Sequence, residues 1–347
     1  MTNKVLLSHG SGGVETAELL KKLIFSRVPE GLMKVNGGLG IDRPDDSALI
    51  PIGKDEYLVI SIDSYTVNPP FFPGGNIGVL AATGSINDVA VMGGVPIAIL
   101  DSIVVEEGFP LSDLEIITNS FIDVLRRENV SLIGGDFKVM PKGQLDKIVI
   151  TTVGIGITSR PIIDYPREGD KIIVSGYLGD HGAVILMSQI GMSTVDQSGK
   201  ALVSDVRSLA GIMKKLNEKL WPYIHAARDP TRGGLAGVLN DWATVSKTVI
   251  VVNEVLIPIR SSTKYFAGMM GIDPLYLASE GAVVLSVSPE YADEALSIMR
   301  ENGFENANII GEVKRSAEYA GIVLMKSVVG GYRILEPPRG ELVPRIC

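Results

Sequence analysis

The chain has 347 residues, of which 46% are hydrophobic and 21% are charged, and this is enough apolar material for the cores of two domains. A net charge of −8 without any basic block argues against a nucleic-acid partner. The chain lacks an apolar run of the ~18 residues that a membrane span needs, and its start lacks a signal-peptide core. Its single cysteine fits a reducing compartment, so we expect a cytoplasmic protein that does not enter a membrane.

Strands and helices alternate in the first half of the chain. Runs of β-branched and apolar residues predict strands at 57–62, 97–105 and 147–153, and spaced apolar positions predict helices at 76–92 and 112–128. Ser112 followed by Glu115 has the pattern of a capping box, which predicts that the second helix begins at this serine.

The segment 160–170 contains two prolines and several charges, and it is the best candidate for a domain boundary. After it we expect helices at 180–191, 204–219, 232–245 and 289–302, and strands at 171–174, 249–253, 282–288, 307–313 and 319–326. Because both halves mix helices and strands, the sequence predicts an α+β fold of two domains, residues 1–160 and 161–336.

The last 11 residues, 337–347, are predicted to form a mobile tail. Pro337, Pro338 and Pro344 exclude a helix there, and an extended tail of this length reaches roughly 36 Å. The sole cysteine, Cys347, ends this tail and has no partner for an intrachain disulfide or a thiolate metal site. It is therefore a thiol on a tether.

Acidic residues in the first half lie beside apolar segments or paired glycines. The residues of these four groups are Asp45 with Asp46, Asp63, Asn87 with Asp88, and Asp136. Carboxylates in apolar surroundings are costly unless they are paired or bind a cation, and several oxygen ligands together suit Mg²⁺ that bridges nucleotide phosphates. Each acid alone is more typical of a cap, a turn or a salt bridge, and it is the recurrence that favours a metal–phosphate site.

The motif Asp229-Pro-Thr-Arg-Gly-Gly234 is expected to open a helix. Asp229 would cap the helix, the glycines would expose N–H groups at its positive end, and Arg232 would add a donor for a phosphate. An ordinary capped helix explains the same residues equally well.

Three further features are candidates for chemistry. The glycine loop from His9 to Gly13 would close over phosphates, or it is a plain N-terminal turn. Lys138 and Glu280 border apolar runs and are candidates for acid–base groups, although a surface salt bridge is the commoner role for such residues.

Together with the run 71–78 and the ending Pro344-Arg-Ile-Cys347, these motifs resemble the HypE family of hydrogenase maturation factors. That family is part of the superfamily of aminoimidazole ribonucleotide synthetase, selenophosphate synthetase and thiamine-phosphate kinase. The likeness extends over nearly the whole chain. The acidic motifs are typical of the superfamily, whereas the ending is specific to HypE.

The resemblance implies two domains that dimerise through their N-terminal halves, with ATP near that interface. It also implies ATP-dependent dehydration of an S-carbamoyl cysteine to an S-cyano cysteine, which supplies the cyanide ligand of nickel–iron hydrogenases. The implied partners are the carbamoyltransferase HypF, which loads the thiol, and the HypC–HypD complex, which accepts the cyanide.

By the same resemblance, each candidate residue has an expected role. The residues expected to bind Mg²⁺ with ATP are Asp46, Asp63, Asp88 and Asp229, and those expected to contact the nucleotide or support this site are His9, Asp45, Asn87, Asp136 and Arg232. Lys138 and Glu280 are assigned to orienting the thiocarbamate and removing its protons, and Cys347 is the carrier.

Two other functions compete with this one. The first is another enzyme of the superfamily, but a selenophosphate synthetase usually carries a reactive cysteine or selenocysteine near its N-terminus, and the glycine loop here has none. The second is a partner module without catalysis, in which the tail is a docking peptide and the acids are structural.

Overall fold

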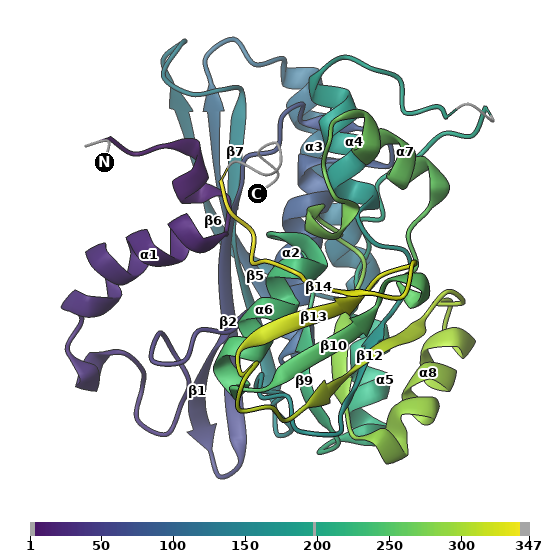
Figure 1. Ribbon diagram of the computed structural model, residues 1–347. Coiled ribbons are helices and arrows are strands. Elements are labelled where there is room, and N and C mark those ends of the chain that lie inside the picture. The colour runs from purple at the N-terminus through teal and green to yellow at the C-terminus, as the bar shows by residue number, and fades with distance from the viewer. Residues whose placement is uncertain (1–3, 197–198, 341–347) are drawn as a thin grey trace.

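The computed structural model describes residues 4–196 and 199–340, and Figure 1 shows their arrangement. The first half builds a five-stranded sheet with the strand order β1-β2-β7-β5-β6. Its strands are β1 (Ala48–Gly53), β2 (Glu56–Tyr65), β5 (Val95–Glu106), β6 (Ser131–Met140) and β7 (Ile148–Thr158). Its other elements are η1 (Leu7–Gly10), α1 (Val14–Leu23), the short ribbon of β3 (Phe71–Phe72) and β4 (Gly75–Asn76), α2 (Ile77–Val91) and α3 (Leu111–Glu128).

The second half builds a seven-stranded sheet with the order β14-β13-β10-β12-β8-β11-β9. Its strands are β8 (Lys171–Val174), β9 (Ile224–Arg228), β10 (Val249–Asn253), β11 (Val284–Val287), β12 (Asn308–Lys314), β13 (Ile322–Lys326) and β14 (Tyr332–Ile334). Its helices are α4 (Asp180–Gln189), α5 (Ala210–Leu220), α6 (Gly234–Ser246), α7 (Ser261–Met269) and α8 (Ala292–Glu301). Among the helices of residues 4–196 and 199–340, none combines the length and the apolar character that a membrane crossing requires.

The predicted α+β fold of two mixed units is confirmed, and several helices begin earlier or later than predicted. Helix α3 begins at Leu111, before the predicted cap at Ser112, because the carbonyl of Pro110 accepts the first helical hydrogen bonds. Helix α5 begins at Ala210 rather than at 204, since residues 202–209 form neither helix nor strand.

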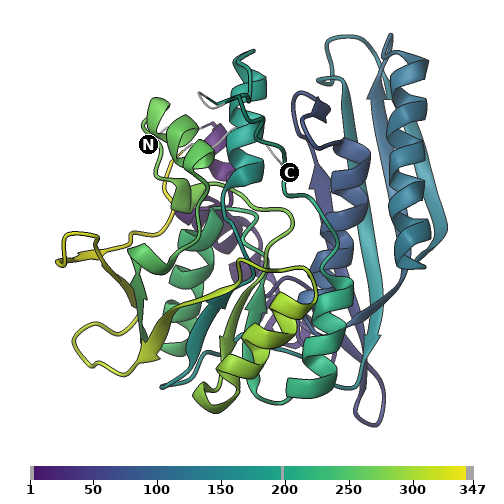
Figure 2. The same cartoon turned by 90° about the vertical axis from the view of Figure 1, so that its right-hand side faces the viewer.

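Helix α2 lies at the boundary of the two halves, as Figure 2 shows. It is apolar on every side, and 13 of its 15 residues are buried, which is the pattern of a helix at the centre of a protein. Its residues contribute to the core that α2 shares with α3 and α4 and to a second core that includes α5 and α8. The two halves are therefore packed through one shared helix.

Asn87 is a buried polar residue of α2, and it ties this helix to the second half. Its Nδ2 donates to the carbonyls of Arg207, at 3.2 Å, and Glu280, at 3.3 Å. Its Oδ1 accepts from the backbone N–H of Leu209 at 2.7 Å. In this structure the amide of Asn87 is fully buried and bonded to the protein's own backbone, so we assign it to bracing α2, and its contact with a nucleotide stays a prediction.

We predict that Asn87→Ala lowers the free energy of unfolding by about 2–3 kcal/mol, because it leaves the N–H of Leu209 and the carbonyl of Arg207 without their Asn87 partner and leaves the carbonyl of Glu280 with only a long bond from the N–H of Arg207. Urea unfolding followed by circular dichroism measures this change. The matched control is Asn119→Ala on the exposed side of α3, for which we expect a change within about 0.5 kcal/mol. Equal stability of the two variants would contradict the bracing role of Asn87.

Candidate active site

A largely buried arginine at the end of β9, Arg228, whose side chain is 14% exposed, joins four carboxylates from distant parts of the chain. Its guanidinium lies 2.9 Å from Asp164 in the linker and 3.0 Å from Asp241 on α6. It also lies 3.5 Å from Asp45 and 3.4 Å from Asp46, which precede β1. One positive charge thus holds together the first half, the linker and the second half.

The carboxylate of Asp45 is used within this network. One oxygen accepts from the backbone N–H of Asp164 and the other from that of Asp46, both at 3.0 Å, and 1% of the side chain is exposed. We therefore assign Asp45 to holding the Asp46 loop in place, rather than to direct contact with a nucleotide.

Five acidic residues from different elements form what we call the acid cluster. Asp46 precedes β1, Asp63 lies on β2, Asp88 lies on α2, Asp229 follows β9, and Glu280 precedes β11. Oxygens of three of them, Asp46 Oδ2, Asp229 Oδ2 and Glu280 Oε1, are buried and accept no hydrogen bond from residues 4–196 and 199–340. Buried carboxylate oxygens are costly in this state, so the cluster is suited to a cation or another donor that comes from outside.

Burial and the closeness of the other acids raise the pKa values of the carboxyl groups in the acid cluster. Burial raises the pKa of Asp88 well above its ordinary value, and the charges of Asp63, Asp229 and Asp46 raise it further. Burial and then the charge of Asp63 raise the pKa of Asp229 to about 7. The pKa of Glu280 is also raised, by burial first and then by Asp229. Each acid thus raises the cost of ionising its neighbours.

The acid cluster fits Mg²⁺ only together with a phosphate. Within the described residues, no three carboxylates or imidazoles are close enough to hold a metal ion by themselves. Mg²⁺ usually binds one or two carboxylates plus the phosphates of a substrate, and the unpartnered oxygens of Asp46 and Asp229 suit that arrangement. Arg232, half exposed and 3.9 Å from Asp63, places a cation at the edge of the cluster.

The helix after the Asp229 motif begins later than predicted. Helix α6 begins at Gly234 with Gly233 as its N-cap, so Asp229 belongs to the acid cluster and does not cap the helix. The start of the helix is covered, because the ring of Pro338 packs against Gly233. The predicted phosphate cradle at this helix start is therefore filled by the protein's own chain.

Lys138 and Asp136 lie away from the acid cluster within one chain. They form an exposed ion pair of 2.9 Å on the edge strand β6. In the strand register Asp63 lies opposite Thr152, whose side chain bonds to α2, so Asp63 is on the face of the sheet that α2 covers. Asp136 lies opposite Ser102, and these two residues are on the other face of the sheet. A single chain therefore does not bring Lys138 to Glu280.

The glycine loop lies beside the C-terminal segment. His9 Nδ1 accepts from the N–H of Leu6 at 3.0 Å, and Gly12 and Gly13 pack against Arg232 and Pro338. In Figure 1 the yellow C-terminal segment runs up to the purple N-terminal segment. The predicted carrier, Cys347, lies outside the described residues.

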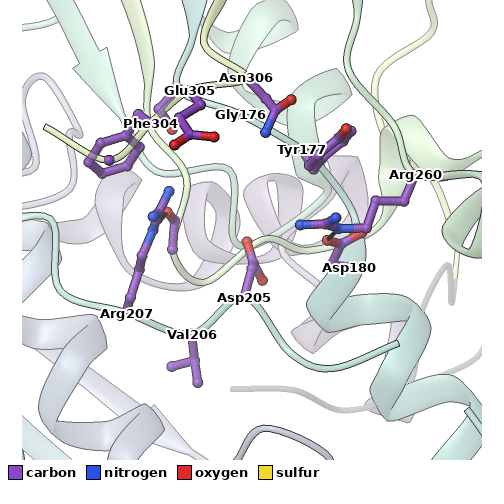
Figure 3. A pocket seen from close by; sticks show the side chains of 13 residues that line it. Gly176, Tyr177, Asp180, Asp205, Val206, Arg207, Arg260, Phe304, Glu305 and Asn306 are labelled. Atoms are coloured by element: carbon purple, nitrogen blue, oxygen red, sulfur yellow. Dashed lines mark hydrogen bonds and ion pairs between the residues drawn. The ribbon is translucent and has the colours of Figure 1, made fainter. Parts of the chain in front are cut away.

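A cavity of about 300 Å³ is lined by Gly281, the residue after Glu280, and by the side chains shown in Figure 3. Arg207, stacked on Phe304, and Arg260, stacked on Tyr177, enter it from opposite sides, with Asp205 between them. Asp205 Oδ1 accepts from the N–H of Glu280 at 3.2 Å, while its Oδ2 is buried without a partner.

Sequence reasoning missed Asp205 and Arg228. Asp205 lies in an extended segment with no motif around it. A signal existed for Arg228. It ends the apolar strand 224–228 and directly precedes the Asp229 motif, and an arginine in such surroundings needs acidic partners close by.

Comparison with known proteins places this site in a family. The family models for AIR synthase related proteins match residues 44–158, as the N-terminal domain, and 167–323, as the C-terminal domain. A putative hydrogenase expression/formation protein of Methanocaldococcus jannaschii is 41% identical, over 99% of this chain and 100% of that protein. The carbamoyl dehydratase HypE of Rhizobium leguminosarum bv. viciae is 36% identical, over 99% of this chain and 95% of that protein. The chain belongs to the HypE family.

Solved HypE structures share the fold. A HypE crystal structure in complex with ATP has a TM-score of 0.79 and 37% identity, and the match covers 99% of this chain and 100% of that one. A HypE–HypF complex has a TM-score of 0.82 and 35% identity, with 92% of this chain and 99% of the matched chain covered. The fold of this chain is therefore the fold of those HypE structures.

We predict that Arg228→Met lowers the free energy of unfolding by about 3–5 kcal/mol, since it leaves Asp164 and its neighbours as buried charges without a counter-ion. Guanidinium unfolding at pH 7 measures the change. The control is Arg126→Met, which removes an exposed ion pair with Asp123 and is expected to cost less than about 0.5 kcal/mol. A loss below 1 kcal/mol for Arg228→Met would show that the network is not what joins the halves.

Proposed function

We propose that this protein is an ATP-dependent carbamoyl dehydratase, which converts an S-carbamoyl group on its own Cys347 into an S-cyano group for hydrogenase maturation. The observation that carries the proposal is the acid cluster, in which carboxylate oxygens without hydrogen-bond partners lie beside Arg232. Support comes from the HypE relatives named as carbamoyl dehydratases and from the HypE structure with ATP.

The chemistry explains why a nucleotide is needed. Conversion of R–S–CO–NH₂ to R–S–C≡N breaks the C–O bond and two N–H bonds, and an amide oxygen is a poor leaving group. Transfer of the terminal phosphoryl group of ATP to that oxygen turns it into phosphate, which leaves as the nitrogen loses its protons. The products are the thiocyanate, ADP and phosphate.

Each residue of the acid cluster has a role in this scheme. Asp46, Asp63, Asp88 and Asp229 would hold Mg²⁺ with the phosphates, and Mg²⁺ would supply neutralisation of the phosphate charge. Arg232 would interact with the transferred phosphoryl group. We assign proton removal to Glu280, because its buried carboxyl has an oxygen, Oε1, that accepts no hydrogen bond from the described residues and is available to a proton of the substrate.

Partners follow from the same scheme. A thiol must first be carbamoylated, and the HypE–HypF structure supports HypF as the protein that loads Cys347. The cyano group must then be unloaded, and we propose the HypC–HypD complex as its acceptor.

We also propose a homodimer that forms through the edge strand β6. This strand leaves one edge of its sheet unpaired, and most of its side chains are exposed, including Leu132, Ile133, Phe137 and Val139. A long apolar edge strand is expected to be covered in solution. Asp136 and Lys138 lie on the same strand, so a site completed across the dimer is where they would meet ATP or the tail.

The test of the proposed function uses the protein with Cys347 carbamoylated in advance. Addition of Mg²⁺ and ATP should lower the mass of the tail by one water, and Asp63→Asn should reduce the rate at least about 100-fold because a phosphate-site ligand is lost. Asp123→Asn on the exposed side of α3 is the control and should react normally. Cys347→Ala should bind ATP and yield no cyano adduct.

An unchanged tail mass in the wild-type protein would refute the dehydratase, and normal turnover in folded Asp63→Asn would show that the ligand is misplaced.

The dimer prediction is tested by analytical ultracentrifugation. Phe137→Glu should convert the dimer into a monomer, because it places a charge in the proposed apolar contact. Val329→Glu, at a residue that is 94% exposed between β13 and β14, is the control and should leave the dimer intact. A monomeric wild-type protein at micromolar concentration would contradict the proposal.

A further inference from the structure

The last described residues of the chain are fastened to the body of the protein before the tail begins. Leu335 is fully buried, its N–H donates to Val323, and its carbonyl accepts from Asn240. The carbonyl of Glu336 accepts from the hydroxyl of Tyr276 at 2.9 Å. These contacts belong to the C-terminal half alone.

Beyond Glu336 the contacts come from the other end of the chain. The N–H of Val14 donates to the carbonyl of Pro338 at 3.0 Å, and Ser11 Oγ donates to the carbonyl of Gly340 at 3.0 Å. The N–H of Gly340 donates to the Glu15 carboxylate at 3.1 Å. We call the N-terminal residues of these contacts, Ser11, Val14 and Glu15, together with Gly13 the N-terminal clamp.

Steric fit explains why the clamp contains glycine. A Cβ on Gly13 would lie 2.5 Å from the carbonyl oxygen of Pro338, too close for any real contact. A Cβ on Gly233, on the other side of the buried Pro338, would lie 2.6 Å from the proline ring. Pro338 is thus enclosed between the N-terminal loop and the start of α6.

The clamp lies at the edge of the acid cluster. A Cβ on Gly12 would lie 2.5 Å from Cβ of Arg232, and Arg232 pairs with Asp63. The glycine loop therefore contacts both the tail root, through Gly13, and the arginine at the edge of the cluster, through Gly12.

We propose that the glycine loop is a clamp for the substrate-bearing tail, which fixes the point from which Cys347 enters the acid cluster. This inference rests on the proposed function, in which Cys347 carries the carbamoyl group. It assigns Ser11, Gly13 and Glu15 as positioning residues and gives the loop a purpose other than closing over phosphates.

The length of the tether sets the size of the expected effect. With Gly340 held, seven residues, 341–347, reach about 24 Å. Without the clamp the tether starts after Glu336 and has 11 residues. Because effective concentration falls roughly as the −3/2 power of tether length, this change alone lowers the concentration of the thiol at the site about twofold. The clamp therefore acts on tail delivery and leaves nucleotide affinity unchanged, whereas a phosphate lid would act on nucleotide affinity.

Trypsin cleavage after Arg339 measures the clamp without reference to activity. Cleavage there releases residues 340–347 and requires the segment around Pro338 to detach, so intact-mass analysis of the full protein follows detachment directly. In Gly13→Ala we expect cleavage about tenfold faster than in the wild type, which corresponds to the loss of one hydrogen bond of ordinary strength. Gly13 has an extended φ of −92° that alanine adopts easily, so the clash with Pro338 is the change that matters.

The matched control is Gly10→Ala in the same loop, where a Cβ would meet no atom within 4 Å and cleavage should equal that of the wild type. Ser11→Ala removes a hydrogen bond without adding bulk and should also speed cleavage, which covers the case that Gly13→Ala fails to fold. In both clamp variants the Kd for ATP should stay within twofold of the wild-type value, and water loss from carbamoylated Cys347 should slow at least about twofold.

Unchanged cleavage after Arg339 in both clamp variants would overturn the inference. If those variants also lost affinity for ATP, the loop would be a phosphate lid and not a clamp for the tail. If the wild type loses no water from its tail, the proposed function fails, and the cleavage comparison still reports whether the clamp exists.

Discussion

The guanidinium of Arg228 is the interaction on which the candidate site depends. It lies within 3.5 Å of carboxylates before β1, in the linker and on α6, so a single buried charge fixes the relative positions of three parts of the chain. Two members of the acid cluster are tied to this arginine: Asp46 forms an ion pair with it, and Asp229 is the next residue in the chain. In a buried ion pair of this kind the cost of removing both charges from water offsets much of their attraction, but the pair still fixes the positions of its members. Here that restriction positions the cluster.

The acid cluster itself is destabilising in the absence of a ligand. Burial and mutual repulsion raise the pKa values of Asp46, Asp88, Asp229 and Glu280, which means that the folded protein resists ionising them. Proteins commonly accept such a cost at a site where a ligand later removes it. The buried network around Arg228, the core around α2 and the packing of Pro338 supply the rigidity that keeps these acids together despite the repulsion.

Local sequence signals predicted much of the fold, and the acids of the cluster were recognised from their places at strand ends and in an apolar helix. The strands at 171–174 and 249–253 match the structure to the residue, because β-branched runs with clear ends leave little choice. What could not be predicted depends on contacts between distant residues. Asn87 looks like a ligand in sequence, and only its tertiary partners, which include Arg207 and Leu209, show that it is a brace. The glycine loop likewise has no local feature that reveals Pro338 as its neighbour, 325 residues away from Gly13.

The position of α2 restricts how this protein can move. Enzymes that enclose a substrate often do so by rotating two domains about a hinge, and such a hinge needs a boundary that opens without exposing a core. Here the boundary is a helix whose side chains are buried on both sides, and opening it would expose the apolar cores that both halves share. Rotation of one half against the other about this boundary is therefore disfavoured. The acid cluster is accordingly expected to keep one geometry, so a substrate has to be brought to it and is not enclosed by closing domains.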